Sequence, residues 1–200
     1  DLTKERKYQR EKRKKNNFKV ASLVGYTNSG KSTTMNTLLE MYNNNKKVFQ
    51  KNMLFATLET ATRHIKLDNN LEFLLTDTVG FINKLPHTLV EAFKSTLEEI
   101  NEASLIIHVV DASNENYINQ IETTNKVLKE IGAVDIPVLY AFNKIDKVEG
   151  YFFIPSNYEN AIRMSAKTKQ GISDLINKIE ENLFSSYKTC TFKIPYDKGN

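Results

Sequence analysis

Two glycines, a lysine and a serine occur at a spacing typical of a phosphate-binding loop. Gly25, Gly30, Lys31 and Ser32 fit the pattern G-x-x-x-x-G-K-[ST], directly after an apolar run. Glycines let backbone N–H groups surround phosphate oxygens, and a following helix N-terminus adds positive dipole. Lys31 would neutralise the β/γ-phosphates and Ser32 would bind Mg²⁺. The predicted nucleotide contacts are Gly25, Tyr26, Thr27, Asn28, Ser29, Gly30, Lys31, Ser32 and Thr33.

A second group of residues could act on the metal and the terminal phosphate. Asp77 and Gly80 form D-x-x-G, 46 residues beyond Lys31 and after the apolar run 71–75. A carboxylate at a strand end can hold Mg²⁺ through water, and a glycine amide can meet the γ-phosphate. Alone this pattern indicates only a turn, but its position after the phosphate loop gives it weight.

A third group predicts the base that is bound. Asn143, Lys144 and Asp146 form N-K-x-D at the end of the apolar run 137–142. A carboxylate there can accept two hydrogen bonds, from guanine N1–H and the 2-amino group, which adenine lacks. Asn143 would brace the loops and the stem of Lys144 would cover the base. Ser165, Ala166 and Lys167 follow another strand, where the Ala166 amide would contact guanine O6 and Lys167 would lie over the ring.

A threonine between the first two motifs should complete the Mg²⁺ site when the γ-phosphate is present. Thr57, Thr60 and Thr62 are the candidates, and spacing does not separate them.

These residues require a sheet that places strand ends side by side. Apolar runs predict strands at 18–24, 105–110, 137–142 and 161–164, with a hairpin over 63–75 that turns at 68–70. Helical spacing predicts helices over 31–42, 118–131 (ended by Gly132) and 172–183. The predicted core-facing residues of the last two are Ile118, Ile121, Leu128 and Ile131, and then Ile172, Leu175, Ile176, Ile179 and Leu183. A capping box opens another helix at 88–91, with an apolar face of Leu89, Phe93, Leu97 and Ile100. The expected class is α/β: a mostly parallel six-stranded P-loop sheet with one antiparallel edge strand, flanked by helices.

Composition sets the broader context. The 200 residues are 40% hydrophobic and 26% charged, as in an ordinary globular domain. No apolar run reaches the ~18–20 residues of a membrane span, and the single Cys190 favours the reducing cytoplasm. We expect His64 and His87 at loops or element ends and His108 in a buried strand, with no metal-ligand spacing among them.

The net charge of +4 is concentrated in a leader, because residues 1–19 hold nine Lys/Arg and three Asp/Glu. The rest of the chain is slightly acidic. Such a segment is either a solvated linker or a surface for a phosphate-rich partner such as RNA, and the sequence leaves both readings open.

Longer strings resemble the HflX family of translational GTPases over about residues 18–184. They are GYTNSGKS (25–32), LFATL (54–58), DTVGFI (77–82), KLPH (84–87), EAFKSTLEE (91–99) and HVVDAS (108–113), in this order. The resemblance implies a translation-factor-type G domain with Thr57 as the switch Mg²⁺ ligand, beside Phe55 and Ala56. Lys31, Thr57 and Gly80 would then be the catalytic residues.

The resemblance also implies partners and domain limits. HflX proteins associate with the large ribosomal subunit and can split stalled ribosomes under stress. Residues 1–17 resemble a basic helical linker from an upstream domain, 18–185 the G domain, and 186–200 the start of a C-terminal extension. We expect a monomeric G domain that binds GTP or GDP, with ribosomal RNA reached through residues 4–15.

Two residues modify the expected mechanism. Phe81 stands where Ras-like enzymes place a water-orienting glutamine, so hydrolysis should be slow without an activator. Asn28 matches relatives in which this asparagine holds K⁺, although it could equally serve only a tight loop. Equal turnover in KCl and NaCl would remove the K⁺ interpretation.

Three functions therefore compete. The leading one is a GTP hydrolase whose switch loops (48–62 and 78–87) change affinity for a ribosomal partner. The second is a nucleotide-sensing ribosome- or RNA-binding module in which hydrolysis is incidental, and Phe81 supports it. RNA remodelling through the leader is weaker, because its basic residues lack interleaved aromatics.

Overall fold

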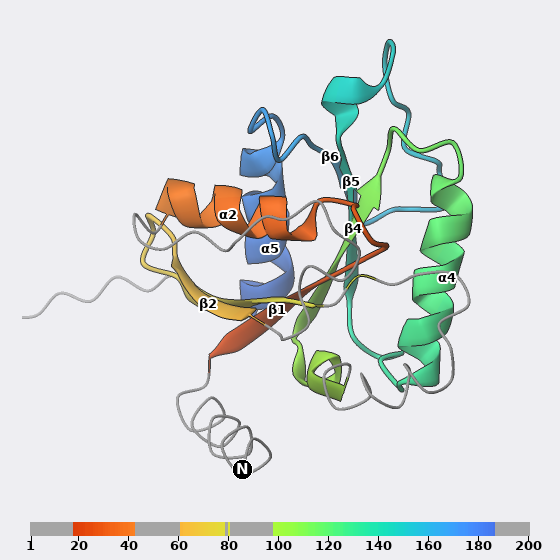
Figure 1. The fold of residues 1–200 in the computed structure, drawn as a ribbon. Coiled ribbons are helices and arrows are strands. Elements are labelled where there is room, and N and C mark those ends of the chain that lie inside the picture. Colours follow the sequence, from red (N-terminus) through yellow and green to blue (C-terminus); the bar gives the residue numbers. More distant parts are fainter. Residues whose placement is uncertain (1–17, 43–60, 79, 81–97, 187–200) are drawn as a thin grey trace, which may run out of the picture.

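A six-stranded sheet organises the molecule. The computed structural model describes residues 18–42, 61–78, 80 and 98–186. The strands are β1 (Lys19–Val24), β2 (Ala61–Lys66), β3 (Glu72–Asp77), β4 (Leu105–Asp111), β5 (Val138–Asn143) and β6 (Ala161–Arg163), in the order β2-β3-β1-β4-β5-β6 (Figure 1). Only β2 runs antiparallel to its neighbour. The predicted fold class, including the antiparallel edge strand, is confirmed.

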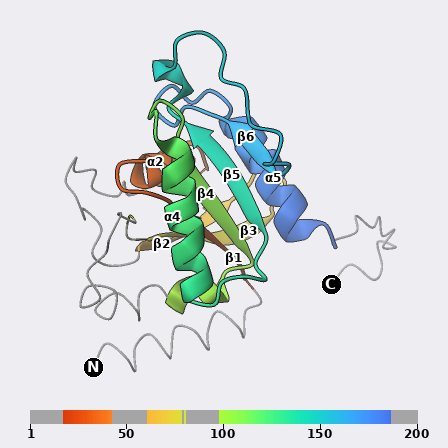
Figure 2. The same cartoon turned by 90° about the vertical axis from the view of Figure 1, so that its right-hand side faces the viewer.

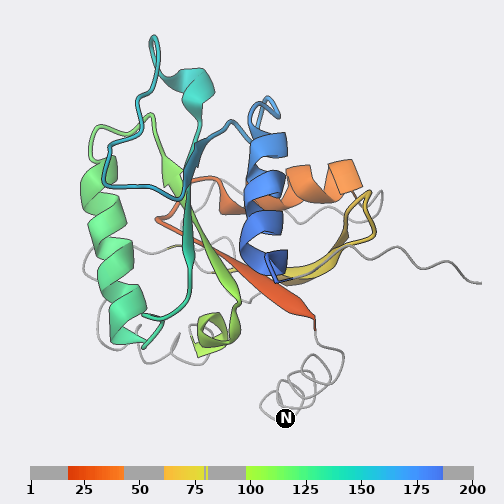
Figure 3. The same ribbon diagram turned by 180° about the vertical axis from the view of Figure 1, so that it is seen from behind.

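Helices cover both faces of the sheet. The helices α2 (Lys31–Tyr42) and α5 (Ile172–Phe184) pack on one face, and α4 (Tyr117–Glu130) packs on the other (Figures 2 and 3). Two 3₁₀ helices, η1 (Glu98–Glu102) and η2 (Ile145–Lys147), complete the described elements. No helix among the described residues is both long and apolar enough to cross a membrane.

The apolar patterns account for these elements. All five apolar residues predicted to face the core from the last helix are buried in α5: Ile172, Leu175, Ile176, Ile179 and Leu183. Met35, Leu38 and Leu39 are likewise buried in α2.

On α4 the prediction is only partly right. Ile121 and Leu128 are buried, but Ile118 is 37% exposed. In the same first turn, Tyr117 packs on Phe142 of β5 instead, with ring centroids 6.0 Å apart, so the helical spacing assigns the wrong residue of this turn to the core.

Local signals set the element ends. The hairpin turns at 68–70 as predicted, with Asn70 in the left-handed region and the Leu71 amide donating to Asn69 Oδ1. At the end of α4, the Gly132 amide donates to the Lys129 carbonyl and the Ala133 amide to the Leu128 carbonyl. This pair is the Schellman arrangement that a glycine at φ +82° permits.

Three predicted details differ or lie beyond the description. Ile100, expected on the helix opened at 88–91, lies in η1 and is fully buried, whereas 88–91 are outside the described residues. His64 lies inside β2 rather than at an element end, with Nε2 3.1 Å from Glu72 Oε2. Asp77 is the last residue of β3 itself, because that strand continues beyond Leu75 to form the ladder with β1 and β2.

His108 is the buried strand histidine that the sequence predicts. It is 1% exposed in β4, its ring lies 5.3 Å from that of Tyr140, and its Nδ1 has no hydrogen-bond partner. Burial, and secondarily the charge of Lys31, lowers the pKa of His108 to about 3. The imidazole is therefore neutral in the folded chain at pH 7.

Acidification should therefore destabilise the fold through His108. Its pKa is about 3 folded and 6.5 in model peptides, so the unfolded chain binds the extra proton between these values. Its contribution is complete above pH 6.5 and falls by roughly 1.4 kcal/mol per pH unit below it. Urea unfolding at pH 7.5, 6 and 5 measures this slope. His108→Leu should flatten it and His64→Gln should not; equal slopes for His108→Leu and the unmodified chain would contradict the assignment.

Candidate functional site

The predicted phosphate loop joins the carboxyl end of β1 to the first turn of α2. Gly25 has φ +145° and Gly30 has φ +104°, a region that side chains strain. A Cβ at Gly25 would lie 2.2 Å from the Val109 carbonyl oxygen, and one at Gly30 would lie 2.2 Å from Asn143 Nδ2. The neighbouring strands β4 and β5 therefore approach the loop so closely that both glycines are required.

Lys31 lies inside this loop. Its ammonium donates to the carbonyl oxygens of Gly25 (3.2 Å) and Tyr26 (3.1 Å). Burial lowers the pKa of Lys31 to about 8, although the nearby Asp77 opposes this shift. A Cβ at Gly80 would lie 3.1 Å from the Lys31 ammonium, so the glycine of D-x-x-G lies next to the phosphate-loop lysine. Since an anion would favour the charged lysine, a phosphate is the natural ligand here.

Ser32 and Asp77 come together as the metal prediction requires. Ser32 Oγ donates to Asp77 Oδ2 at 2.6 Å, and Asp77 is fully buried. The following residue, Thr78, donates its hydroxyl to the Leu23 carbonyl at 2.7 Å and ties the end of β3 to β1. A hydroxyl and a carboxylate at one point are hard oxygen donors, which is the ligand chemistry that Mg²⁺ prefers.

Of the three candidate threonines, the structure describes only one. Thr62 lies in β2, with its hydroxyl 3.2 Å from that of Thr76 across the hairpin. Thr62 is thus part of the sheet rather than a loop. Thr57 and Thr60, together with Phe55, Ala56 and Phe81, lie outside the described residues.

Asn143 joins the base motif to the phosphate loop. It is 2% exposed at the end of β5. Its Nδ2 donates to the Ser29 carbonyl at 2.9 Å, and its Oδ1 accepts from the Ala166 amide at 2.9 Å. The side chain therefore braces both loops, as the sequence predicts.

Lys144 and Asp146 complete this edge. Lys144 has φ +64°, and its ammonium donates to the Asn28 carbonyl and, at 2.7 Å, to Asp111. Asp146 is exposed at η2, and its Oδ1 accepts from Ser165 Oγ at 2.6 Å. Ser165 in turn accepts from the Thr168 amide, so the loop after β6 orients the carboxylate. Lys167 is exposed on the same loop.

Two residues of this network were not predicted. Asp111 ends β4 and contacts Lys144, while Thr37 on α2 donates to the Ala166 carbonyl at 2.8 Å. The signal available for Asp111 was its position, a carboxylate at the end of an apolar strand. Thr37 offered none, because a threonine within a helix is ordinary.

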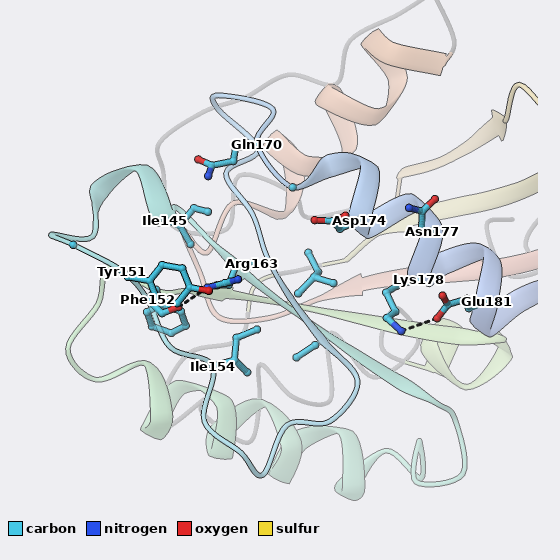
Figure 4. Close-up of a pocket in the computed structure, with 14 residues that line it drawn as sticks. Ile145, Tyr151, Phe152, Ile154, Arg163, Gln170, Asp174, Asn177, Lys178 and Glu181 are labelled. Carbon is cyan, nitrogen blue, oxygen red and sulfur yellow. Dashed lines mark hydrogen bonds and ion pairs between the residues drawn. The ribbon is translucent and has the colours of Figure 1, made fainter.

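A pocket lies along β6, and Ile145 of the N-K-x-D motif is among the residues that line it (Figure 4). It has a volume of about 690 Å³ between the segment 150–154, β6 and α5. Arg163 lies over the Tyr151 ring at 4.1 Å, and Lys178 pairs with Glu181 within it. Neither the phosphate loop nor Asp146 lines this pocket, so it is distinct from the phosphate site and shares only Ile145 with the base motif.

Comparisons with known proteins agree with this geometry. Residues 20–144 match the family model described as 50S ribosome-binding GTPase. GTPase HflX of Caldanaerobacter subterraneus subsp. tengcongensis is 43% identical over 198 residues, which are 99% of this chain and 44% of that protein. GTPase HflX of Escherichia coli is 41% identical over 204 residues, 99% of this chain and 46% of that protein. The chain thus spans less than half the length of these two relatives.

A solved structure shares the fold. It is a GTP-binding protein from the archaeon Sulfolobus solfataricus in complex with GDP, with a TM-score of 0.67 and 26% identity. The match covers 91% of this chain and 58% of that one. Fold and motif geometry together define a P-loop GTPase domain. Since the family model and the relatives agree over most of its length, the chain belongs to the 50S ribosome-binding GTPases, and among them to the HflX family.

Proposed function

We propose that this chain binds GTP with Mg²⁺ and hydrolyses it to GDP and phosphate. The observation that carries the proposal is the meeting of three motifs at one sheet edge. Lys31 and the Ser32–Asp77 pair stand at the phosphate loop, and Asn143 links that loop to the segment that holds Asp146. A phosphate site and a guanine-selective carboxylate thus share one rigid frame.

On this proposal each residue has a role. Backbone amides of 25–33 surround the phosphates, Lys31 neutralises the β/γ-oxygens, and Gly80 meets the γ-phosphate. Ser32 would bind Mg²⁺ directly, Asp77 would bind it through water, and Thr57, beside Phe55 and Ala56, would be a further ligand. Asn143, Lys144, Asp146, Ser165, Ala166 and Lys167 hold the base. Bound Mg²⁺ supplies charge stabilisation to the phosphates.

We further propose that nucleotide state controls an interaction with the large ribosomal subunit. The family description and the HflX relatives support it. The order of parts would be a basic linker at 1–17, a monomeric G domain at 18–185 and the start of a further domain at 186–200, working in the cytoplasm. Ribosomal RNA would meet residues 4–15.

Turnover should be slow without a partner, because Phe81 cannot orient water. We expect large ribosomal subunits to stimulate the full-length protein, on the order of 10³-fold, the scale on which supplied activator groups act in related enzymes. Phosphate release by this chain and by the full-length protein, with and without subunits, measures it. Rapid turnover without ribosomes would contradict the role of Phe81, and no stimulation of either protein would exclude the ribosomal partner.

The alternative is a nucleotide-sensing module in which hydrolysis is incidental, and Phe81 is the residue that favours it. Loading the protein with a non-hydrolysable GTP analogue separates the two. Full biological activity over repeated cycles in that state would favour the sensing module. A single round of biological activity followed by arrest would favour the hydrolase.

A K⁺ ion at Asn28 remains a prediction from the sequence. Asn28 has φ +60°, and Lys144 donates to its carbonyl oxygen. Comparing turnover in KCl and NaCl tests whether its side chain also holds an ion.

A further inference from the structure

Asp111, to which the sequence motifs assign no role, lies at the centre of a hydrogen-bond network. It ends β4, directly beside Asn143 in the parallel ladder to β5. Its side chain is 16% exposed. Oδ1 accepts from the Ser113 amide (3.1 Å) and the Ser113 hydroxyl (2.6 Å), and Oδ2 accepts from Lys144 at 2.7 Å. Three donors therefore fix this carboxylate in one orientation.

The carboxylate places the Lys144 ammonium on the phosphate loop. Lys144 donates both to Asp111 and to the Asn28 carbonyl, while the preceding Asn143 donates to the Ser29 carbonyl. Two consecutive residues of the base motif thus hold two consecutive carbonyl groups of the phosphate loop. Because C=O and N–H point in opposite directions across a trans peptide, these contacts also fix the directions of the Ser29 and Gly30 amides.

We infer that Asp111 is a positioning residue that sets the lifetime of the bound guanine nucleotide by holding Lys144 against the Asn28 carbonyl. The inference rests on the proposed function and extends it to nucleotide release. A lysine side chain has much rotamer freedom, so without its carboxylate partner Lys144 would sample other orientations. Both the stem that covers the base and the contact to the phosphate loop would then loosen together.

Asparagine at position 111 tests the contact with little change of shape. Its single oxygen can accept from Ser113, which leaves the amide NH₂ facing the Lys144 ammonium, donor against donor. If the amide turns around, the two Ser113 donors lose their acceptor instead. Either orientation therefore breaks one half of the network.

The decisive measurement is the dissociation rate of fluorescent GDP, chased by excess GDP in a stopped-flow instrument. Asp111→Asn should raise the rate about tenfold, less than the loss of a fully buried charge pair would cause, because the side chains of Lys144 and Asp111 are 23% and 16% exposed. The single-turnover hydrolysis rate of bound GTP is measured beside it, and the melting temperature of the nucleotide-free chain shows whether the variant is folded. Asp135→Asn, which removes an exposed carboxylate elsewhere, is the matched control and should change none of them.

Each result has a distinct meaning. An unchanged dissociation rate for Asp111→Asn overturns the inference, as does an increase matched by Asp135→Asn. If the unmodified chain binds no GDP, the proposed function itself fails. Should Asp111→Asn fold poorly, Ser113→Ala removes only the orienting hydroxyl and should raise the rate about threefold, a small part of the effect of the charge. No increase in that variant overturns the inference as well.

Discussion

Replacing Lys31 by methionine should lower affinity for GDP and GTP by roughly 100-fold or more, because a buried cation that meets phosphate oxygens is lost. Lys31 is 7% exposed, and its ammonium is held in the loop by the Gly25 and Tyr26 carbonyls. Methionine keeps most of the aliphatic stem, so the packing between β1 and α2 should survive. Fluorescent-nucleotide titration gives the affinity directly.

The nucleotide-free form of this variant supplies the control. Burial lowers the pKa of Lys31 to about 8, so at pH 7 the charged group destabilises the folded chain relative to the unfolded one. Lys31→Met should therefore melt at the same temperature as the unmodified chain, or higher, in the absence of nucleotide. Excess GDP should raise the melting temperature of the unmodified chain only. A variant that retained GDP affinity within threefold would exclude Lys31 from phosphate binding.

Replacing Asp146 by asparagine should exchange base preference from guanine to xanthine. The carboxylate can accept from both N1–H and the 2-amino group of guanine. An asparagine there has one acceptor and one donor, which suits the N1–H and O2 of xanthine. Because a hydrogen bond to a charged group contributes about 1.5–3 kcal/mol, GDP affinity should fall by roughly 10- to 100-fold. Affinity for xanthosine diphosphate should rise above that for GDP.

The contacts around Asp146 make this a specific test. Ser165 donates to Oδ1, and an asparagine oxygen in that place can still accept this bond. Competition between GDP and xanthosine diphosphate for a fluorescent nucleotide measures the preference. Asp174→Asn, in α5 and lining the separate pocket, is the matched control and should leave it unchanged. Equal loss of both nucleotides would indicate that Asp146 only maintains the loop.

The order of elements was predictable because local signals agree with the tertiary fold. Five apolar positions at helical spacing specify the buried face of α5, and Gly132 ends α4 at the residue where a left-handed conformation is needed. Ile118 shows the limit of this reasoning. Its spacing matches the apolar stripe of α4, but Tyr117 is the residue of the first turn that packs on the sheet, and a helical period does not contain that choice.

The site was predictable where chemistry and spacing coincide. Lys31, Asp77 and Asn143 belong to motifs whose residue types are those that phosphate binding, metal binding and the bracing of two loops require. Asp111 and Thr37 were not found, since their contacts join residues 33 and 129 positions apart. Such pairs are fixed by the sheet order, which places β4 between β1 and β5.

The brace at Asn143 has a consequence for how the protein is made. It joins Ser29 to a residue 114 positions later and then to the loop after β6. During synthesis, the phosphate loop leaves the ribosome long before β5 and β6 exist to hold its carbonyl groups. A nascent chain should therefore gain no stabilisation from cellular GTP until nearly the whole domain has emerged. Guanine nucleotide would then stabilise only chains in which the whole sheet has formed.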